Sequence, residues 1–108
     1  MKVGCDIVEI ERVRKALQRT KGFPNFLTER ETAIFNHLSE HRKPEWLAGR
    51  FAAKEAVIKA MHGIKELTLL DVEILADAQG APYCSLPDVQ VSIAHEREYA
   101  IAYALAEG

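Results

Sequence analysis

The stretch WLAGRFAAKEAVIK, residues 46–59, combines the strongest helical pattern in the chain with an unusual distribution of charge. At about 100° per residue, Arg50 and Lys54 fall on one line along a helix, and Glu55 and Lys59 fall on a second line about 140° away. Apolar and small residues occupy the rest of the surface, which indicates a largely buried helix. Ionised groups are costly to bury unless a partner charge, a metal ion or a ligand neutralises them. These four charges therefore need partners.

The residues alone leave two interpretations of these charges. In the first, Arg50 lies along apolar surface, Lys54 reaches water, and Glu55 pairs with Lys59 at i, i+4, which is worth roughly 0.2–0.5 kcal/mol. In the second, the charges bind a metal ion or an anionic ligand. Because structural ion pairs outnumber functional ones, the helix taken by itself favours the first interpretation.

The order of residues in this helix resembles a known signature. WxxxRFxxKEAxxK, residues 46–59, is similar to the signature of the 4'-phosphopantetheinyl transferases. GRFAAKEAVIKA, residues 49–60, resembles their small bacterial branch, the holo-[acyl-carrier-protein] synthases. GCDI at residues 4–7 and VSIAH at residues 91–95 resemble the family's other two blocks, in the same order. The resemblance therefore spans the whole chain.

The resemblance implies both a fold and a reaction. The fold is α+β, with an antiparallel-rich sheet packed against a long central helix, and residues 1–108 are expected to form one such domain. The reaction moves 4'-phosphopantetheine from coenzyme A to a serine of an apo acyl carrier protein, which releases adenosine 3',5'-bisphosphate and serves fatty acid biosynthesis. The small branch also implies a homotrimer with active sites between subunits.

Site residues follow from the same resemblance. Asp6 and Glu55 match magnesium ligands, which suits an ion that is typically held by one or two carboxylates plus substrate phosphates. Lys59 is expected to reach a phosphate, and His95 is expected in the coenzyme A site. The other residues expected to contact coenzyme A are Arg50, Lys54, Gly63 and Pro82. Glu55, a metal-bound water and His95 all remain candidates for the base that deprotonates the serine.

Two positions depart from the family pattern. Related chains usually follow the last lysine with a Gly-Thr-Gly turn, whereas this chain has MHGI at residues 61–64. His62 is a candidate replacement donor for a phosphate, although a histidine at a helix C-terminus also favours the helix dipole. Related chains carry Ser or Thr before the histidine, whereas this chain has Ala94. One hydroxyl contact to coenzyme A is therefore missing.

Alternation and helical spacing predict the remaining elements. Residues 2–10 read as a strand whose two faces are both apolar enough for an interior position. Residues 28–31, TERE, form a capping box that begins a helix running to about Leu38. Further strands are expected at residues 69–76, 81–86, 89–95 and 99–106. The last strand has only alanines on one side, which predicts that the 46–59 helix packs there.

Residues 11–20 read as a helix with a basic outer face. This face is either simply solvated or a docking surface for an acidic partner. The resemblance favours docking, because acyl carrier proteins present an acidic helix to this part of the synthases. Arg12 and Arg14 are the leading candidates, and they are expected to affect the rate and salt dependence of association more than raw affinity.

Composition narrows the function classes. A net charge of −2 without any basic run argues against a nucleic-acid partner, and no apolar segment is long enough for a membrane span. We therefore expect a cytoplasmic protein in which Cys5 and Cys84 are reduced and buried. His37 and His41 have a metal-ligand spacing but no third ligand nearby. The rival functions are a metal-dependent phosphodiesterase and a noncatalytic carrier-protein or nucleotide-binding module.

Overall fold

The structure, a computed structural model of the chain, describes residues 1–107. Its elements in chain order are β1 (Lys2–Glu9), α1 (Ile10–Arg19), α2 (Glu29–His37), α3 (Lys43–Ala60), the 3-10 turn η1 (Leu69–Asp71), β2 (Ile74–Ala76), β3 (Pro82–Cys84), β4 (Val89–His95) and β5 (Tyr99–Ala106). The fold is α+β, as the sequence predicts. None of the helices within residues 1–107 is both long and apolar enough to cross a membrane.

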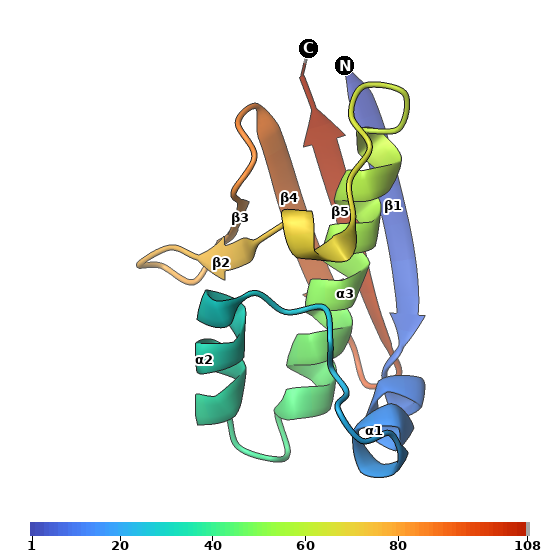
Figure 1. Cartoon of the computed structure of the whole chain (residues 1–108), viewed down its shortest axis with the longest axis vertical. Coiled ribbons are helices and arrows are strands. Elements are labelled where there is room, and N and C mark those ends of the chain that lie inside the picture. Colours follow the sequence, from blue (N-terminus) through green and yellow to red (C-terminus); the bar gives the residue numbers. More distant parts are fainter. Residues whose placement is uncertain (108) are drawn as a thin grey trace.

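The main sheet has the strand order β1-β5-β4, and both pairings are antiparallel. β1 pairs along its whole length with β5, from Lys2 opposite Ala106 to Glu9 opposite Tyr99. β2 and β3 form a separate two-stranded hairpin to one side (Figure 1). β1 is therefore an edge strand. The prediction of an interior position was wrong, because β1 pairs with β5 alone. Its second apolar face is also left open in this chain.

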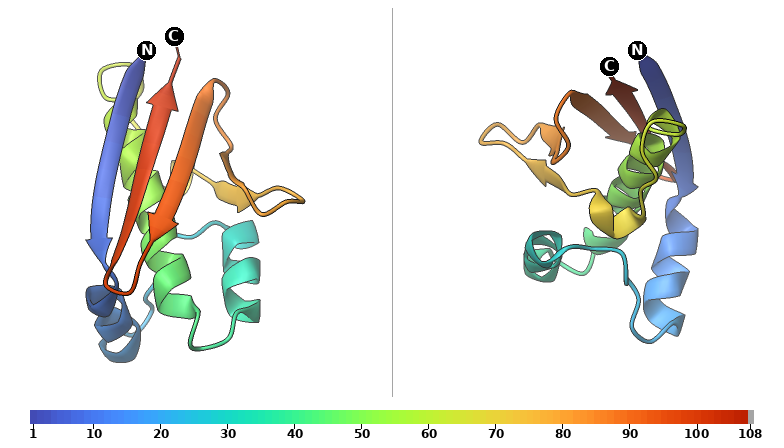
Figure 2. Two further views of the ribbon diagram at one scale, coloured as in Figure 1. Left: turned by 180° about the vertical axis from the view of Figure 1, so that it is seen from behind. Right: turned by 45° about the horizontal axis from the view of Figure 1, so that its top comes forward.

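Helix α3 lies along one face of the sheet, and in the described chain no helix covers the other face (Figure 2). The alanines of β5 all face α3 and are buried, as are alanines along the second half of α3. These residues are Ala100, Ala102, Ala104 and Ala106 on the strand, and Ala52, Ala53, Ala56 and Ala60 on the helix. Small side chains on both surfaces let the two elements approach closely. The predicted packing of this helix on the alanine face is confirmed.

Helices α1 and α2 attach to the first half of α3 through a second cluster of buried residues. Ile10 and Val13 of α1 and Phe35 of α2 meet Leu47 of α3 there. Helix α2 begins with the predicted capping box, since the Thr28 side chain accepts from the Glu31 backbone and the Glu31 side chain accepts from the Thr28 backbone.

Two local predictions were wrong. Residues 69–76 do not form one strand, because Asp71 accepts hydrogen bonds from the Thr68 backbone at 2.8 Å and hydroxyl at 3.0 Å and closes η1 there. Cys5 is exposed rather than buried, because it lies on the open face of the sheet. Cys84 is half-buried, and burial raises the pKa of its thiol.

Candidate active site

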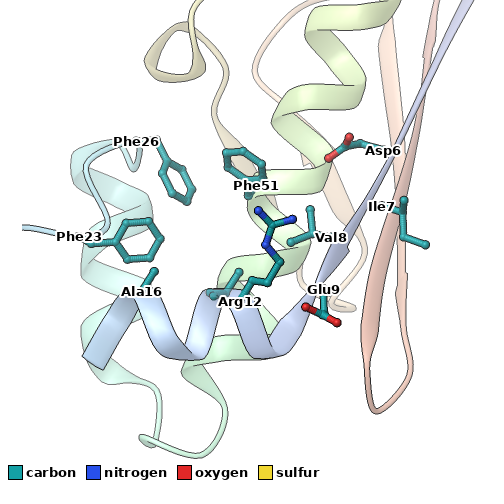
Figure 3. A pocket seen from close by; sticks show the side chains of 10 residues that line it. Asp6, Ile7, Val8, Glu9, Arg12, Ala16, Phe23, Phe26 and Phe51 are labelled. Carbon is teal, nitrogen blue, oxygen red and sulfur yellow. The ribbon is translucent and has the colours of Figure 1, made fainter. Parts of the chain in front are cut away.

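The site is centred on Asp6 of β1 and Lys59 of α3. Asp6 points from the strand toward the helix (Figure 3). The Lys59 ammonium lies 3.1 Å from Asp6 Oδ1 and donates to the Cys5 carbonyl at 2.9 Å. The Asp6 side chain is 17% exposed and that of Lys59 is 53% exposed. The pair therefore stands at the edge of the strand–helix contact, where a ligand can reach it.

Gly4 explains how a short aspartate reaches the helix. Gly4 is buried, and a Cβ atom there would lie 1.9 Å from the Ala56 carbonyl oxygen and 2.8 Å from the Ala60 nitrogen. The backbones of β1 and α3 are thus almost in contact at this point. Asp6 follows two residues later on the same face of the strand, where the Lys59 side chain reaches it.

Glu55 lies one helical turn before Lys59 and is half-buried. The interpretation of Glu55 and Lys59 as an ordinary i, i+4 pair is wrong, because the ammonium of Lys59 binds Asp6 and the Cys5 carbonyl instead. Among the described residues, no hydrogen bond or ion pair is formed by the Glu55 carboxylate. A half-buried carboxylate without a partner is unfavourable, and a bound cation would offset that cost.

The donor set fits magnesium better than a metal held by protein ligands alone. Within residues 1–107 there is no group of three or more His, Cys, Asp or Glu side chains placed to hold a metal. Asp6 and Glu55 would supply two carboxylates on facing elements. Magnesium is usually bound by one or two carboxylates together with waters and substrate phosphates, so two suffice.

The position of Lys54 fits neither expectation, a contact with coenzyme A or exposure to water. Lys54 is fully buried, pairs with Glu31, and donates to the carbonyls of Phe26 and Leu69. Its donors are occupied inside the protein. Sequence reasoning missed Glu31, although its place four residues before the buried Phe35 on the inner side of α2 was a usable signal.

Arg50 is more restricted than the sequence suggested. Its Nε donates to the Ile74 carbonyl at 3.2 Å, and its guanidinium stacks 4.5 Å from the Trp46 ring centre. Burial lowers the pKa of Arg50 from its ordinary value, and the nearby Glu31 charge acts in the opposite direction. The residue is 9% exposed, which leaves only the edge of the guanidinium for a phosphate.

His95 does not join Asp6 within one chain. It ends β4, and its Nδ1 lies 3.8 Å from Glu45 Oε2 near the start of α3. Asp6 lies on β1 at the other edge of the sheet, and α3 runs over the central strand between them. Gly63, with φ of 84°, turns the chain beyond the other end of α3, and Pro82 begins β3 on the side hairpin. One chain therefore does not gather all the predicted coenzyme A residues.

A cavity of about 380 Å³ opens next to Asp6, and side chains of α1 line part of it (Figure 3). Three phenylalanines, at positions 23, 26 and 51, form its apolar part, and Arg12 stands at its side. Arg12 is exposed and has no ion pair within residues 1–107, whereas Arg14 pairs with Glu11 in the same helix. Sequence reasoning did not identify this cavity, because its walls come from three separate segments.

Chemically, the arrangement suits a reaction on a diphosphate. Asp6 and Glu55 are carboxylates on facing elements, Lys59 can donate to an anionic oxygen, and the apolar cavity adjoins Asp6. Phosphoryl transfer depends mainly on positioning and on stabilising charge on phosphate oxygens, which is what such a set provides.

Comparison with known proteins points the same way. The family model described as the 4'-phosphopantetheinyl transferase superfamily matches residues 2–104. A holo-[acyl-carrier-protein] synthase of Geobacillus kaustophilus is 46% identical over 97% of this chain and 87% of its own length. A holo-[acyl-carrier-protein] synthase of Bacillus velezensis is 49% identical over 97% of this chain and 93% of its own length. A Bacillus anthracis synthase solved with CoA (3',5'-ADP) has a TM-score of 0.84 at 38% identity, covering 95% of this chain and 92% of the other. The Helicobacter pylori synthase in complex with coenzyme A has a TM-score of 0.81 at 32% identity, covering 97% of this chain and 99% of the other.

Proposed function

Because the chain belongs to the 4'-phosphopantetheinyl transferase superfamily, we propose that it transfers 4'-phosphopantetheine from coenzyme A to a serine of an apo acyl carrier protein. The observation that carries this proposal is the Asp6–Lys59 contact beside the unpartnered Glu55, at the edge of an open cavity. We also infer a cytoplasmic location, in keeping with coenzyme A as the proposed substrate.

In the proposed reaction, the serine oxygen attacks the phosphorus that carries pantetheine, and the bond to the second phosphate of the diphosphate breaks. The leaving group is adenosine 3',5'-bisphosphate. Asp6 and Glu55 would hold Mg²⁺, which neutralises charge on the diphosphate when it is bound. Lys59 stabilises the same charge through a hydrogen bond to a phosphate oxygen. The serine proton goes to Glu55 or to His95. Since α3 separates His95 from Asp6 in one chain, His95 would act in the site of a neighbouring copy.

Intact-mass measurement tests the proposal directly. The chain is incubated with coenzyme A, Mg²⁺ and an apo carrier protein, and the carrier should gain the mass of one phosphopantetheine group. A carrier whose serine is replaced by alanine is the control and should gain nothing. Hydrolysis of coenzyme A without a gain would favour the phosphodiesterase, and binding without turnover would favour the noncatalytic module.

We infer a homotrimer from the open face of the sheet together with the small-branch resemblance. Large apolar side chains on that face are exposed, including Val3 at 69%, Ile7 at 61% and Tyr103 at 54%. A contiguous apolar surface of this kind is typical of a protein interface. A second cavity on it brings Ile7 together with His95, so a copy seated there would lie beside the histidine.

Ile7→Glu is expected to break the assembly, because it places a charge in the centre of the proposed interface. Sedimentation should show monomers, circular dichroism should stay unchanged, and transfer activity should fall at least about tenfold if the site needs two copies. Leu70→Glu is the matched control, since Leu70 is 55% exposed on η1, away from the sheet face. An Ile7→Glu chain that remains trimeric contradicts the inferred interface.

Arg12 and Arg14 of α1 are proposed to dock the carrier protein. Arg12→Glu should raise the carrier KM about tenfold and reduce its dependence on salt, while the coenzyme A KM stays within about twofold, because the charge pair acts on association. Arg30→Glu is the control, an equal charge change on α2 beside Glu73. Steady-state kinetics at two ionic strengths checks this, and an unchanged carrier KM would remove Arg12 from the docking surface.

A further inference from the structure

Lys54 and Glu31 form an ion pair at the centre of the protein, although Lys54 belongs to the signature shared with the transferases. The two charged atoms lie 2.7 Å apart, and both side chains are 0% exposed. The Lys54 ammonium also donates to the Phe26 carbonyl at 2.7 Å and to the Leu69 carbonyl at 3.0 Å. Three oxygens thus surround a fully buried ammonium group, which leaves no open side for a phosphate oxygen.

The Glu31 carboxylate is equally occupied. Its Oε1 also accepts from the Thr28 backbone at 2.9 Å, and its Oε2 accepts from the Ile74 backbone at 2.7 Å. Within residues 1–107, no buried side-chain nitrogen or oxygen lacks a partner. The pair therefore joins five segments that are separate in the sequence: α3, the 20–28 connection, α2, η1 and β2.

The same helix register places both the buried pair and the candidate site. Lys54 and Glu55 are consecutive, so their side chains diverge by about 100°. Lys54 points into the buried cluster between α2 and η1, while Glu55 lies one turn from Lys59, which reaches Asp6. Rotating or sliding α3 would unpair a buried charge, which is strongly unfavourable. The pair thereby restricts where Glu55 can point.

The pair also holds a wall of the cavity. The Phe26 carbonyl binds Lys54, and the Phe26 ring packs at 5.2 Å on Phe51 and at 5.9 Å on Phe23 between ring centres. All three rings line the cavity that begins at Asp6. Directional bonds to carbonyls fix this segment in one position, which a pair of apolar side chains of the same volume would not do.

We propose that Lys54 and Glu31 are positioning residues for the transfer reaction: their buried pair contacts neither coenzyme A nor carrier protein, and it sets the register of α3 and the position of the Phe26 segment so that Glu55 and the cavity wall meet at Asp6. The kinetic part of this inference rests on the proposed function. The structural part, that the pair fixes these segments, does not.

Three variants test it by exchange and melting, with Lys54→Arg added in the kinetics: Lys54→Met, the double variant Lys54→Met/Glu31→Gln, and Lys59→Met as the matched control on the same helix. In chains free of metal and substrate, amide hydrogen exchange in residues 23–28 and 66–74 should be at least about tenfold faster in both Lys54 variants and unchanged in the control. Lys54→Met should lower the melting temperature by about 10 °C or more, and the double variant should recover at least half of the loss, since Glu31 no longer carries an unpaired charge.

Kinetics are measured at a temperature where the double variant is fully folded. Its kcat should fall at least about tenfold, and the Mg²⁺ concentration for half-maximal rate should rise, while the coenzyme A KM stays within about threefold. Lys59→Met should instead raise the coenzyme A KM and lower the melting temperature by much less than Lys54→Met does, because the Asp6–Lys59 contact is partly exposed. Lys54→Arg should have a higher kcat than Lys54→Met, because an arginine at this position still places a cation beside Glu31.

Two results would overturn the inference. A folded double variant with normal kcat, Mg²⁺ dependence and exchange would show that the pair contributes only stability. A coenzyme A KM raised in the Lys54 variants, with exchange unchanged, would show that Lys54 is a phosphate ligand after all. A wild-type chain that transfers nothing would refute the proposed function instead, and the exchange and melting measurements would still decide whether the pair fixes the two segments.

Discussion

Glu55→Gln is expected to reduce Mg²⁺-dependent transfer by on the order of 10³-fold or more, which corresponds to about 4 kcal/mol of transition-state stabilisation. The substitution keeps the shape of the side chain and removes the charge that would bind the cation. Because the Glu55 carboxylate is half-buried and forms no ion pair within residues 1–107, the fold should be unaffected. Single-turnover transfer measured over a range of Mg²⁺ concentrations checks the activity, and a thermal melt checks the fold.

Glu66→Gln is the matched control, since Glu66 is an exposed carboxylate after the end of α3. It should transfer at the wild-type rate. Isothermal titration with Mg²⁺ and adenosine 3',5'-bisphosphate adds a readout besides turnover, because the Glu55→Gln chain should bind the pair of ligands at least about tenfold more weakly. Wild-type turnover in Glu55→Gln would remove this residue from the metal site.

Most of the fold was accessible from the sequence, because its signals are local. The alanine side of residues 99–106 predicted where α3 packs, and the capping box at residues 28–31 predicted where α2 begins. The edge position of β1 was not accessible. The residues of a strand do not show whether a further strand pairs along its other side. Two apolar faces also look the same whether a second layer of the same chain or another copy is to cover the open face, where Ile7 is exposed.

The candidate site was predictable in part. Asp6 and Lys59 were expected in it, and the structure brings them into contact. The role of Lys54 was not predictable from spacing, because its partner Glu31 and its acceptors at Phe26 and Leu69 lie 15 to 28 residues away in sequence. A signature shows which residue types recur together, but it does not distinguish a lysine that binds a ligand from one that neutralises a buried carboxylate. Burial distinguishes the two lysines, since the Lys54 side chain is fully buried and that of Lys59 is 53% exposed.

Gly4→Ala is expected to destabilise the protein by at least about 3 kcal/mol, which lowers the melting temperature by roughly 10–20 °C. The added Cβ would lie 1.9 Å from the Ala56 carbonyl oxygen, and that oxygen belongs to the helix backbone, so it cannot rotate away. Alanine restricts the unfolded chain more than glycine does, but that gain is only about 0.5–1 kcal/mol and does not offset the clash. Thermal and urea unfolding measure the difference.

Gly49→Ala is the control for the general effect of a methyl group on this helix–sheet contact. Its Cβ would meet only the Cγ2 atom of Ile93 at 3.1 Å, a side-chain atom that can shift. The gain in helix propensity is about 1 kcal/mol, so the melting temperature should stay close to that of the wild type. A Gly4→Ala chain as stable as Gly49→Ala would contradict the close approach of β1 to α3.

The same substitution also tests whether the site depends on that approach. To admit the methyl group, β1 must move away from α3, and the contacts of Lys59 with Asp6 Oδ1 at 3.1 Å and the Cys5 carbonyl at 2.9 Å would lengthen beyond hydrogen-bond range. Transfer by the folded fraction of Gly4→Ala, measured well below its melting temperature, should therefore fall at least about a hundredfold, because a displacement of about 1 Å is costly for positioned groups. Normal activity in that fraction would show that Asp6 and α3 act independently, and the shared cation site would have to be abandoned.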